Sequence, residues 1–330
     1  MFGNWINVWD LQRVMRNASP GRLWRVLGHA ARRGTARTVG AYTETVRHPD
    51  QWWDVPAVQR RWNELITGDA ELGFRHWVAR EYLAPRGGSL VGLSVACGTG
   101  HRELLWARTG QFTVLHGYDL TPASIAQANA AAHAAGLDGC LTFRVGDVRT
   151  LELAAADRYD VIFGEHALHH LSPLREILAD LDRNLKPDGL LVVDEFVGPR
   201  RFQWTRAQLA EINRLLQTLP EHLRRRTDGR IKRRVIRPSK LSMIHIDPSE
   251  AIESDRILPE LEARFTRVTL RPYGGAILHL LLSGIAHHFC GDDPEAADWL
   301  QRLCAEEDRL MAEGVVASDF VAGVYRKRVS

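Results

Sequence analysis

The stretch LVGLSVACGTG, residues 90–100, decides the fold of this chain. Its first six residues are apolar enough for a buried strand, and Gly98 and Gly100 suit a tight turn into a helix predicted over residues 101–108. The residues that follow repeat this alternation of short apolar runs and helical stretches, which is typical of βαβ units with a parallel sheet. We therefore expect an α/β fold with a doubly wound, Rossmann-like sheet.

Seven strands are predicted, five of them before residue 198 and two after a long insertion. They cover residues 90–95, 112–119, 141–145, 159–164, 190–195, 268–271 and 319–326. Helices are predicted between them, over residues 101–108, 121–136, 173–185, 202–219, 249–264, 276–289 and 295–313. The helix that begins near residue 249 is expected to have Asp247 or Ser249 as its N-cap.

The same pattern divides the chain into four segments. An N-terminal helical cap covers residues 1–85, and the Rossmann-like core covers residues 86–198. A basic helical insert then covers residues 199–254, and residues 255–330 complete the sheet with two strands and further helices.

The composition excludes several classes of protein. A chain of 330 residues with 45% hydrophobic and 25% charged residues fits an ordinary globular protein, and no apolar run reaches the roughly 18 residues of a transmembrane helix. The four cysteines contain no CxxC pair, which argues against a zinc ribbon, an iron–sulfur site and a disulfide scaffold. This cysteine usage predicts a reducing, cytoplasmic location.

Positive charge is concentrated in one segment. Residues 199–240 contain thirteen Lys and Arg against three acids, whereas the whole chain has a net charge of only +3. Such a segment either attracts an anionic partner or forms a solvated helix face. RNA is the less favoured partner, because only Phe202 and Trp204 in this segment could stack on bases. An anionic small molecule, either a biosynthetic intermediate or a glycan precursor, is the preferred one.

The N-terminal residues have an unusual composition. The first 48 contain eight arginines and two acids, with Trp5, Trp9 and Trp24 spaced as on amphipathic helices. Seven of the ten tryptophans precede residue 80, which favours a folded extension. We expect this extension to close a pocket or to form a homodimer interface, and a helix lying on a membrane surface is the alternative.

Glycines and acids follow the first three predicted strands. In open α/β sheets, ligands bind beyond the carboxyl ends of the strands. The first strand ends in the turn of Gly98 and Gly100, and the second ends in Asp119, 21 residues after Gly98. At this spacing a carboxylate reaches the hydroxyls of a bound ribose. Asp147, after the third strand, could accept a hydrogen bond from an adenine amino group.

Together these motifs resemble those of the class I S-adenosylmethionine-dependent methyltransferases, over about residues 88–200. Residues 93–100, 117–122 and 146–148 resemble the first three motifs of the family, and residues 159–162, 167–171 and 185–190 resemble its later ones. Ser94 stands where the family often has an acid, and Ala96 where it often has a glycine. The resemblance implies S-adenosylmethionine as cofactor, with contacts from Ala96, Cys97, Gly98, Gly100, Asp119, Leu120, Gly146, Asp147, Val148 and Glu165.

The resemblance also implies methyl transfer to a small-molecule acceptor, whose accepting atom is oxygen, nitrogen or carbon. The methyl group would point toward the end of the fourth strand, where Glu165 and His166 stand, and the reaction depends mainly on positioning of the nucleophile. If the acceptor must lose a proton, Glu165, His166 and His170 are candidate bases. Glu195, at the end of the fifth strand, is a fourth candidate, while Asp194 is expected on the opposite face.

No metal ligand set is expected from the sequence. His166, His169 and His170 bring three imidazoles within five residues, but no carboxylate completes an H-E-x-x-H pattern. Two other functions remain open: a cofactor-binding enzyme that catalyses a reaction other than methylation, and a non-catalytic partner subunit with the same fold. Retention of Gly98, Gly100, Asp119 and Asp147 argues against the subunit.

Overall fold

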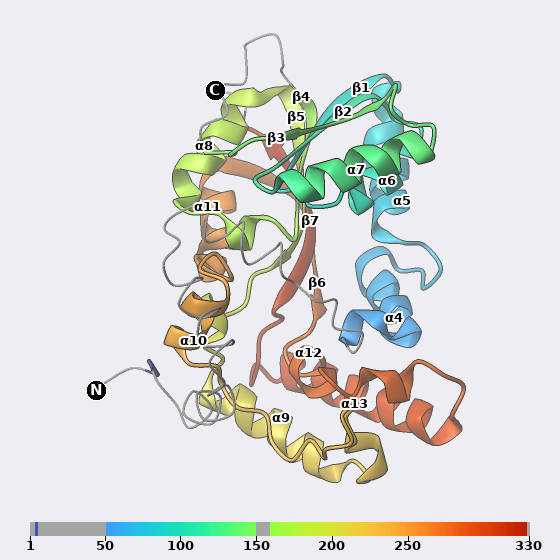
Figure 1. The fold of residues 1–330 in the computed structure, drawn as a ribbon, viewed down its shortest axis with the longest axis vertical. Helices are drawn as coiled ribbons and strands as arrows, with labels where there is room; N and C mark the ends of the chain where they lie inside the picture. The colour runs from blue at the N-terminus through green and yellow to red at the C-terminus, as the bar shows by residue number, and fades with distance from the viewer. Residues whose placement is uncertain (1–3, 6–50, 150–158, 329–330) are drawn as a thin grey trace.

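The protein is described by a computed structural model over residues 4–5, 51–149 and 159–328. Its centre is a seven-stranded sheet of order β3-β2-β1-β4-β5-β7-β6 (Figure 1). The first five strands pair in parallel, and β7 is antiparallel to both of its neighbours. The strand order reverses between β1 and β4, which confirms the predicted doubly wound α/β fold.

The strands occupy the predicted positions, but β5 begins five residues earlier than predicted and β6 extends three residues further at each end. They are β1 (Leu90–Val95), β2 (Phe112–Asp119), β3 (Leu141–Val145), β4 (Tyr159–Glu165), β5 (Leu185–Phe196), β6 (Phe265–Gly274) and β7 (Phe320–Lys327).

The helices surround the sheet and extend beyond one of its ends. They are α4 (Pro56–Thr67), α5 (Phe74–Val78), α6 (His101–Ala107), α7 (Pro122–Ala134), α8 (Leu174–Asn184), α9 (Arg206–Thr218), α10 (Lys240–Ile246), α11 (Ile257–Arg264), α12 (Leu278–Leu282) and α13 (Pro294–Ala312).

Two of the predicted helices were wrong in extent. The helix expected from residue 249 begins only at Ile257, and Asp247 is the C-cap of α10 instead of an N-cap. Asp247 Oδ1 accepts hydrogen bonds from the backbone N–H and the hydroxyl of Ser249, which favours a turn there. The helix expected over residues 276–289 is broken after α12, where Gly284 has a φ of +77°.

Both faces of the sheet are buried, as parallel sheets require. Side chains alternate along β5, so that Val192 joins one hydrophobic cluster and Val193 joins the other. The first cluster includes residues of α4–α7, α9, α12 and α13, whereas the second is formed mainly with α8 and α11. Because side chains alternate along a strand, the position of a residue at the strand end decides which face of the sheet its side chain reaches.

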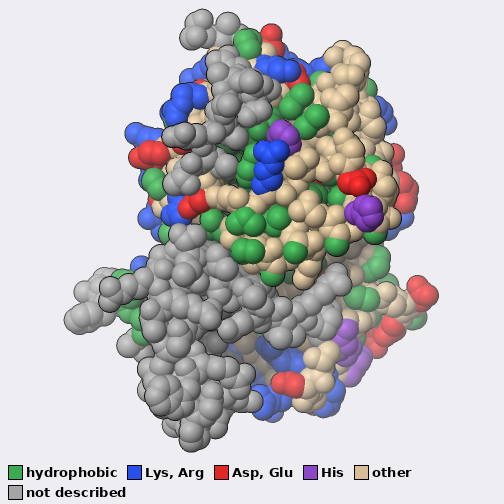
Figure 2. Space-filling view, turned by 45° about the horizontal axis from the view of Figure 1, so that its top comes forward, with side chains coloured by type: hydrophobic (Ala, Val, Ile, Leu, Met, Phe, Trp, Pro, Cys, Tyr) green, Lys and Arg blue, Asp and Glu red, His purple; other side chains and the backbone are tan. Residues whose placement is uncertain are grey.

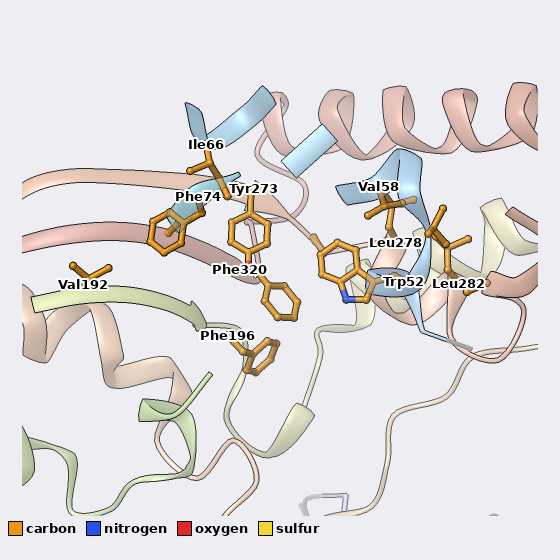
Figure 3. Close-up of a cluster of buried hydrophobic side chains, with 14 of the residues drawn as sticks. Trp52, Val58, Ile66, Phe74, Val192, Phe196, Tyr273, Leu278, Leu282 and Phe320 are labelled. Carbon is orange, nitrogen blue, oxygen red and sulfur yellow. The ribbon is translucent and has the colours of Figure 1, made fainter. Parts of the chain in front are cut away.

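The first cluster joins the N-terminal residues to the sheet (Figure 3). Trp52 is fully buried, and its ring lies 4.5 Å from that of Trp62 and 5.0 Å from that of Phe320. Figure 3 shows Phe196 and Phe320 of the sheet side by side, with Trp52 beyond them toward α12. The helices from residue 52 onward are thus part of the core.

The direction of β7 locates the carboxyl edge of the sheet. β7 runs from Phe320 toward the C-terminus at the top of Figure 1, and β5 runs the opposite way beside it. The parallel strands therefore end toward the lower half of the molecule, which contains α9, α10, α12 and α13. These helices and α4 cover the edge at which ligands bind in this class of fold.

The surface of the sheet-containing half is mixed in charge. In Figure 2, hydrophobic side chains gather near the centre of this half, with basic and acidic side chains around them. None of the helices within the described ranges is long and apolar enough to cross a membrane. Trp9 and Trp24 of the expected amphipathic helices lie outside the described residues, whereas Asn4 and Trp5 accept backbone hydrogen bonds from Lys240 and Leu241.

Candidate functional site

Asp119 connects the turns that follow β1 and β2. Its Oδ2 accepts the backbone N–H of Gly98 at 3.0 Å, and its Oδ1 accepts that of Thr121 at 2.8 Å. Each carboxylate oxygen has a second lone pair that remains for another donor. The carboxylate is therefore held in place while it can still accept hydrogen bonds from ribose hydroxyls.

The two glycines after β1 serve different purposes. Both have positive φ values, +57° at Gly98 and +75° at Gly100. A Cβ at Gly98 would meet nothing within 4 Å, so the backbone there borders open space that a ligand can occupy. A Cβ at Gly100 would lie 2.7 Å from the ring of Phe143, so this glycine permits close packing of α6 against β3.

The other predicted cofactor contacts lie along the same edge. Gly146 donates its N–H to the carbonyl of Asp119 at 2.9 Å, which joins the ends of β2 and β3. Asp147 accepts Nε of Arg149 at 2.9 Å, and this contact lowers the pKa of Asp147. Cys97 is buried, and burial raises the pKa of its thiol. Of the remaining predicted contacts, Ala96, Leu120 and Val148 are half-buried, and Glu165 is buried.

A carboxylate that sequence reasoning missed lies beside Ser94. Glu103 of α6 is 2% exposed, and its Oε1 accepts the Ser94 hydroxyl at 2.6 Å. Burial raises the pKa of Glu103 to about 7, despite the hydrogen bond from Ser94. The acid absent from position 94 is thus supplied by the helix after the glycine turn. Its position on the inner face of that helix was the only signal in the sequence.

Glu165 is held by two side chains at the end of β4. It is buried, and it accepts hydrogen bonds from the indole N–H of Trp106 and from the guanidinium of Arg75. Arg75 comes from α5 in the N-terminal region, and its charge pair with Glu165 was not predictable from spacing. Because Glu165 is buried and its charge is paired with Arg75, it offers an acceptor little accessible carboxylate surface.

His166 is more accessible than Glu165. Its side chain is 32% exposed, and Nε2 lies 3.6 Å from Oδ2 of Asp194. Asp194 also accepts the hydroxyl of Tyr273 at 2.6 Å. Burial by itself would raise the pKa of Asp194, but the charge and hydrogen bond of His166, with the bond from Tyr273, lower it to about 2. His166, Asp194 and Tyr273 therefore form one connected group at the carboxyl edge.

Glu195 points to the opposite face from Asp194, as alternation along β5 predicts. It is fully buried and accepts the backbone N–H groups of Ala167 and Leu168 at 2.5 and 2.6 Å. Its Oε2 lies 2.6 Å from Nδ1 of His169. Burial raises the pKa of Glu195 to about 7 and lowers that of His169 to about 3.

His170 lies beside His169, with the two rings 4.1 Å apart. It is half-buried, and its Nδ1 is 3.3 Å from the hydroxyl of Ser249 in the insert. Burial lowers the pKa of His170 to about 3, and the neighbouring His169 contributes to this shift. Of the four candidate bases, His166 and His170 are thus half-buried, whereas Glu165 and Glu195 are buried.

Comparisons with known proteins agree with this geometry. The family model described as "Methyltransferase domain" matches residues 93–193, which contain the Gly98 turn, Asp119 and Glu165. The chain is 33% identical over 139 residues to the ubiquinone/menaquinone biosynthesis C-methyltransferase UbiE of Dinoroseobacter shibae. That alignment covers 41% of this chain and 52% of the relative, so the chain spans about half the length of the curated relative it matches.

Solved structures show a general likeness. The [4+2]-cyclase SpnF is 18% identical, with a TM-score of 0.45 and coverage of 78% of this chain and 80% of that chain. An S-adenosylmethionine-dependent methyltransferase from Mesorhizobium loti is 17% identical, with a TM-score of 0.44 and coverage of 77% and 99%. Neither likeness bears on the acceptor. The sheet order, the glycine turn bound to Asp119 and the methyltransferase-domain match over residues 93–193 all agree with the fold of class I S-adenosylmethionine-dependent methyltransferases.

Proposed function

We propose that this protein transfers a methyl group from S-adenosylmethionine to a small-molecule acceptor. The observation that carries the proposal is the Asp119 carboxylate, which is fixed by the N–H groups of Gly98 and Thr121 beside the open backbone of Gly98. When bound, S-adenosylmethionine supplies a methyl group that is already activated by its sulfonium. The protein then has to bind the cofactor, orient the acceptor and exclude water.

Calorimetric titration of S-adenosylmethionine and its demethylated product tests this proposal. We expect micromolar binding to the wild type and a loss of about 100-fold in Asp119→Ala, because hydrogen bonds to a charged carboxylate are removed. Asp138→Ala is the matched control, since Asp138 is an exposed acid of the same core that pairs with His133. If the wild type binds, candidate acceptors can be screened for a gain in mass of about 14 daltons, which corresponds to the replacement of one hydrogen by a methyl group. Absence of binding in the wild type would reject the proposal.

The proposal extends to an anionic acceptor. Many cations of the insert are engaged within the protein: Arg200 pairs with Asp255, Arg214 with Glu306, and Lys232 with backbone carbonyls. Arg233 and Arg234 are exposed, and no ion pair joins either of them to an acid among the described residues. These two arginines are therefore the best candidates to attract a negatively charged acceptor.

Charge reversal tests this extension separately. Arg233→Glu combined with Arg234→Glu should raise the acceptor KM at least about tenfold at low salt, with the affinity for S-adenosylmethionine unchanged. Arg302→Glu is a control for net charge alone, because Arg302 lies on α13 and pairs with Asp298. An unchanged acceptor KM in the double variant would remove the anionic acceptor from the proposal.

A cytoplasmic location is also part of the proposal. The four cysteines, Cys97, Cys140, Cys290 and Cys304, are all free thiols. Free thiols are typical of proteins kept in a reducing compartment. Fractionation of cells that express the protein, followed by immunoblotting, would check it.

A further inference from the structure

His169, His170 and Glu250 bring two imidazoles and a carboxylate together. One ligand atom from each lies within 4.8 Å of the others, and His169 Nε2 is 3.7 Å from Oε1 of Glu250. Ligand atoms in a tetrahedral zinc site are about 3.3 Å apart, given bonds of roughly 2.0–2.1 Å. A movement of about 1.5 Å or less would therefore bring all three onto one ion.

Glu195 orients His169 for coordination. Its Oε2 lies 2.6 Å from Nδ1 of His169, which places the ring proton on Nδ1 and leaves the lone pair on Nε2, facing Glu250. Histidines that bind metals nearly always donate their other ring N–H to a carboxylate, carbonyl or water. Glu195 is itself fixed by the N–H groups of Ala167 and Leu168. The cluster thus has both a ligand set and the group that supports it.

The loop that carries Glu250 is held against the two histidines. The backbone N–H of Ile252 donates to the carbonyl of His169 at 3.0 Å, and the backbone N–H of Arg201 donates to the carbonyl of Ala251 at 2.7 Å. Ala251 and Arg201 have φ values of +47° and +54°, which residues with a Cβ rarely adopt. Such strain persists only where the surroundings enforce it, and it is concentrated at functional sites.

The charges around the cluster favour a cation. Glu195, Asp247 and Glu250 all lie near it, together with the cations Arg102 and Arg201, and Arg201 directs Nη1 to the carbonyls of Pro248 and Glu250 at 2.6 and 3.1 Å. Arg201 therefore contributes positive charge but binds neither oxygen of the Glu250 carboxylate in the contacts described. A divalent ion would balance the negative charge of these carboxylates, whose burial without a partner costs free energy.

We infer that His169, His170 and Glu250 bind one divalent transition-metal ion through two imidazole nitrogens and one carboxylate oxygen. Two histidines with one carboxylate suit zinc or iron(II) and leave coordination positions open. An oxygen of the acceptor could bind the ion at such a position, and the ion would then orient it. This role rests on the proposed function, whereas the metal site does not.

Titration with Co²⁺ tests the site, because its visible absorption reports inner-sphere ligands. The full-length chain is first stripped with a chelator and dialysed. We expect one saturable Co²⁺ site per chain. Glu250→Gln and His170→Asn should each lower the Co²⁺ affinity more than about 100-fold. Glu195→Gln should lower it about 10–100-fold, because Glu195 orients the ligand His169. The variant H287N/H288N removes another adjacent histidine pair and should bind Co²⁺ as the wild type does.

Calorimetry with S-adenosylmethionine on the same samples separates this inference from the proposed function. Glu250→Gln should bind the cofactor with unchanged affinity, which also shows that the variant is folded. Absence of stoichiometric Co²⁺ binding in the wild type would overturn the metal site. Equal Co²⁺ affinity in the wild type and Glu250→Gln would overturn it as well, even if methyl transfer were established.

Discussion

At the scale of single residues, His166 is the best-placed base at the end of β4. It is accessible, and Asp194 lies 3.6 Å from its Nε2, whereas both oxygens of Glu165 are engaged by Trp106 and Arg75. Positioned bases contribute about 10²–10⁴-fold to proton transfer. His166→Asn should therefore lower kcat by about that factor for an acceptor that must lose a proton, with the affinity for S-adenosylmethionine unchanged.

The control for this prediction is His133→Asn, which alters an exposed histidine on α7. Steady-state kinetics with saturating cofactor would measure both variants, and Asp194→Asn should give an intermediate loss. A kcat for His166→Asn within about threefold of the wild type would assign the proton transfer elsewhere, or show that none is needed.

A second prediction at this scale concerns Asp319. It is 4% exposed, and Oδ2 accepts the indole N–H of Trp204 and the amide of Gln208, both at 2.9 Å. Burial raises the pKa of Asp319, and the charge of Glu307 adds to this effect, whereas the two hydrogen bonds oppose it. The net result is a pKa of about 7. The folded state therefore binds the proton more tightly than the unfolded chain, where the pKa is about 4.

This shift predicts a loss of stability as pH rises. Between about pH 4 and pH 7 the folded state holds more protons at Asp319, so the contribution of Asp319 to the free energy of unfolding falls across this window and stays low above it. Asp319→Asn should raise the free energy of unfolding by about 2–3 kcal/mol at pH 8.5 and change it little at pH 4. Urea unfolding at the two pH values would measure this, and an equal effect at both would contradict the assignment.

At the scale of elements, α12 depends on charges from elsewhere in the chain. A helix of five residues is too short to be stable alone. Glu307 of α13 accepts the N–H groups of Ile277 and Leu278 at its start, and Lys232 of the insert donates to three carbonyls at its end. Opposite charges at the two ends match the helix dipole.

Lys232→Met should therefore destabilise the protein. Removing the ammonium leaves the carbonyls of Leu280, Leu281 and Ser283 without this donor, and the loss costs about 1–3 kcal/mol where the carbonyl is buried, as at Leu281. We expect the free energy of unfolding to fall by roughly 3 kcal/mol in total. Arg230→Met, an exposed neighbour in the same insert, should change it by less than about 0.5 kcal/mol. Similar unfolding curves for both variants would reject the capping role.

At the scale of the whole molecule, the N-terminal residues complete the core. Trp52 lies outside the family match over residues 93–193, yet it is fully buried between Trp62, Phe320 and His279. Trp52→Ala should lower the free energy of unfolding by about 3–5 kcal/mol. Trp53→Ala is the matched control, because the adjacent Trp53 is 46% exposed. Comparable losses in the two variants, measured by chemical unfolding, would show that the cap does not belong to the core.

The sequence by itself determined the sheet and the cofactor edge. Short apolar runs, the turn of Gly98 and Gly100, and Asp119 at its spacing are local signals, and the strand positions and the family match agree with them. The helix predicted from residue 249 was wrong, because Asp247 formed a turn with Ser249 instead of capping a helix. Local signals predict best where one segment decides its own conformation.

Only the tertiary structure decided which distant side chains meet. Glu103 replaces the acid absent at position 94, Arg75 reaches Glu165, and Glu250 lies against His169 from about 80 residues away. No periodicity encodes such contacts, because they depend on how packed elements place their faces. The sequence therefore specified the core sheet through backbone pattern, whereas the arrangement of the insert after β5 was determined by packing between segments far apart in the chain.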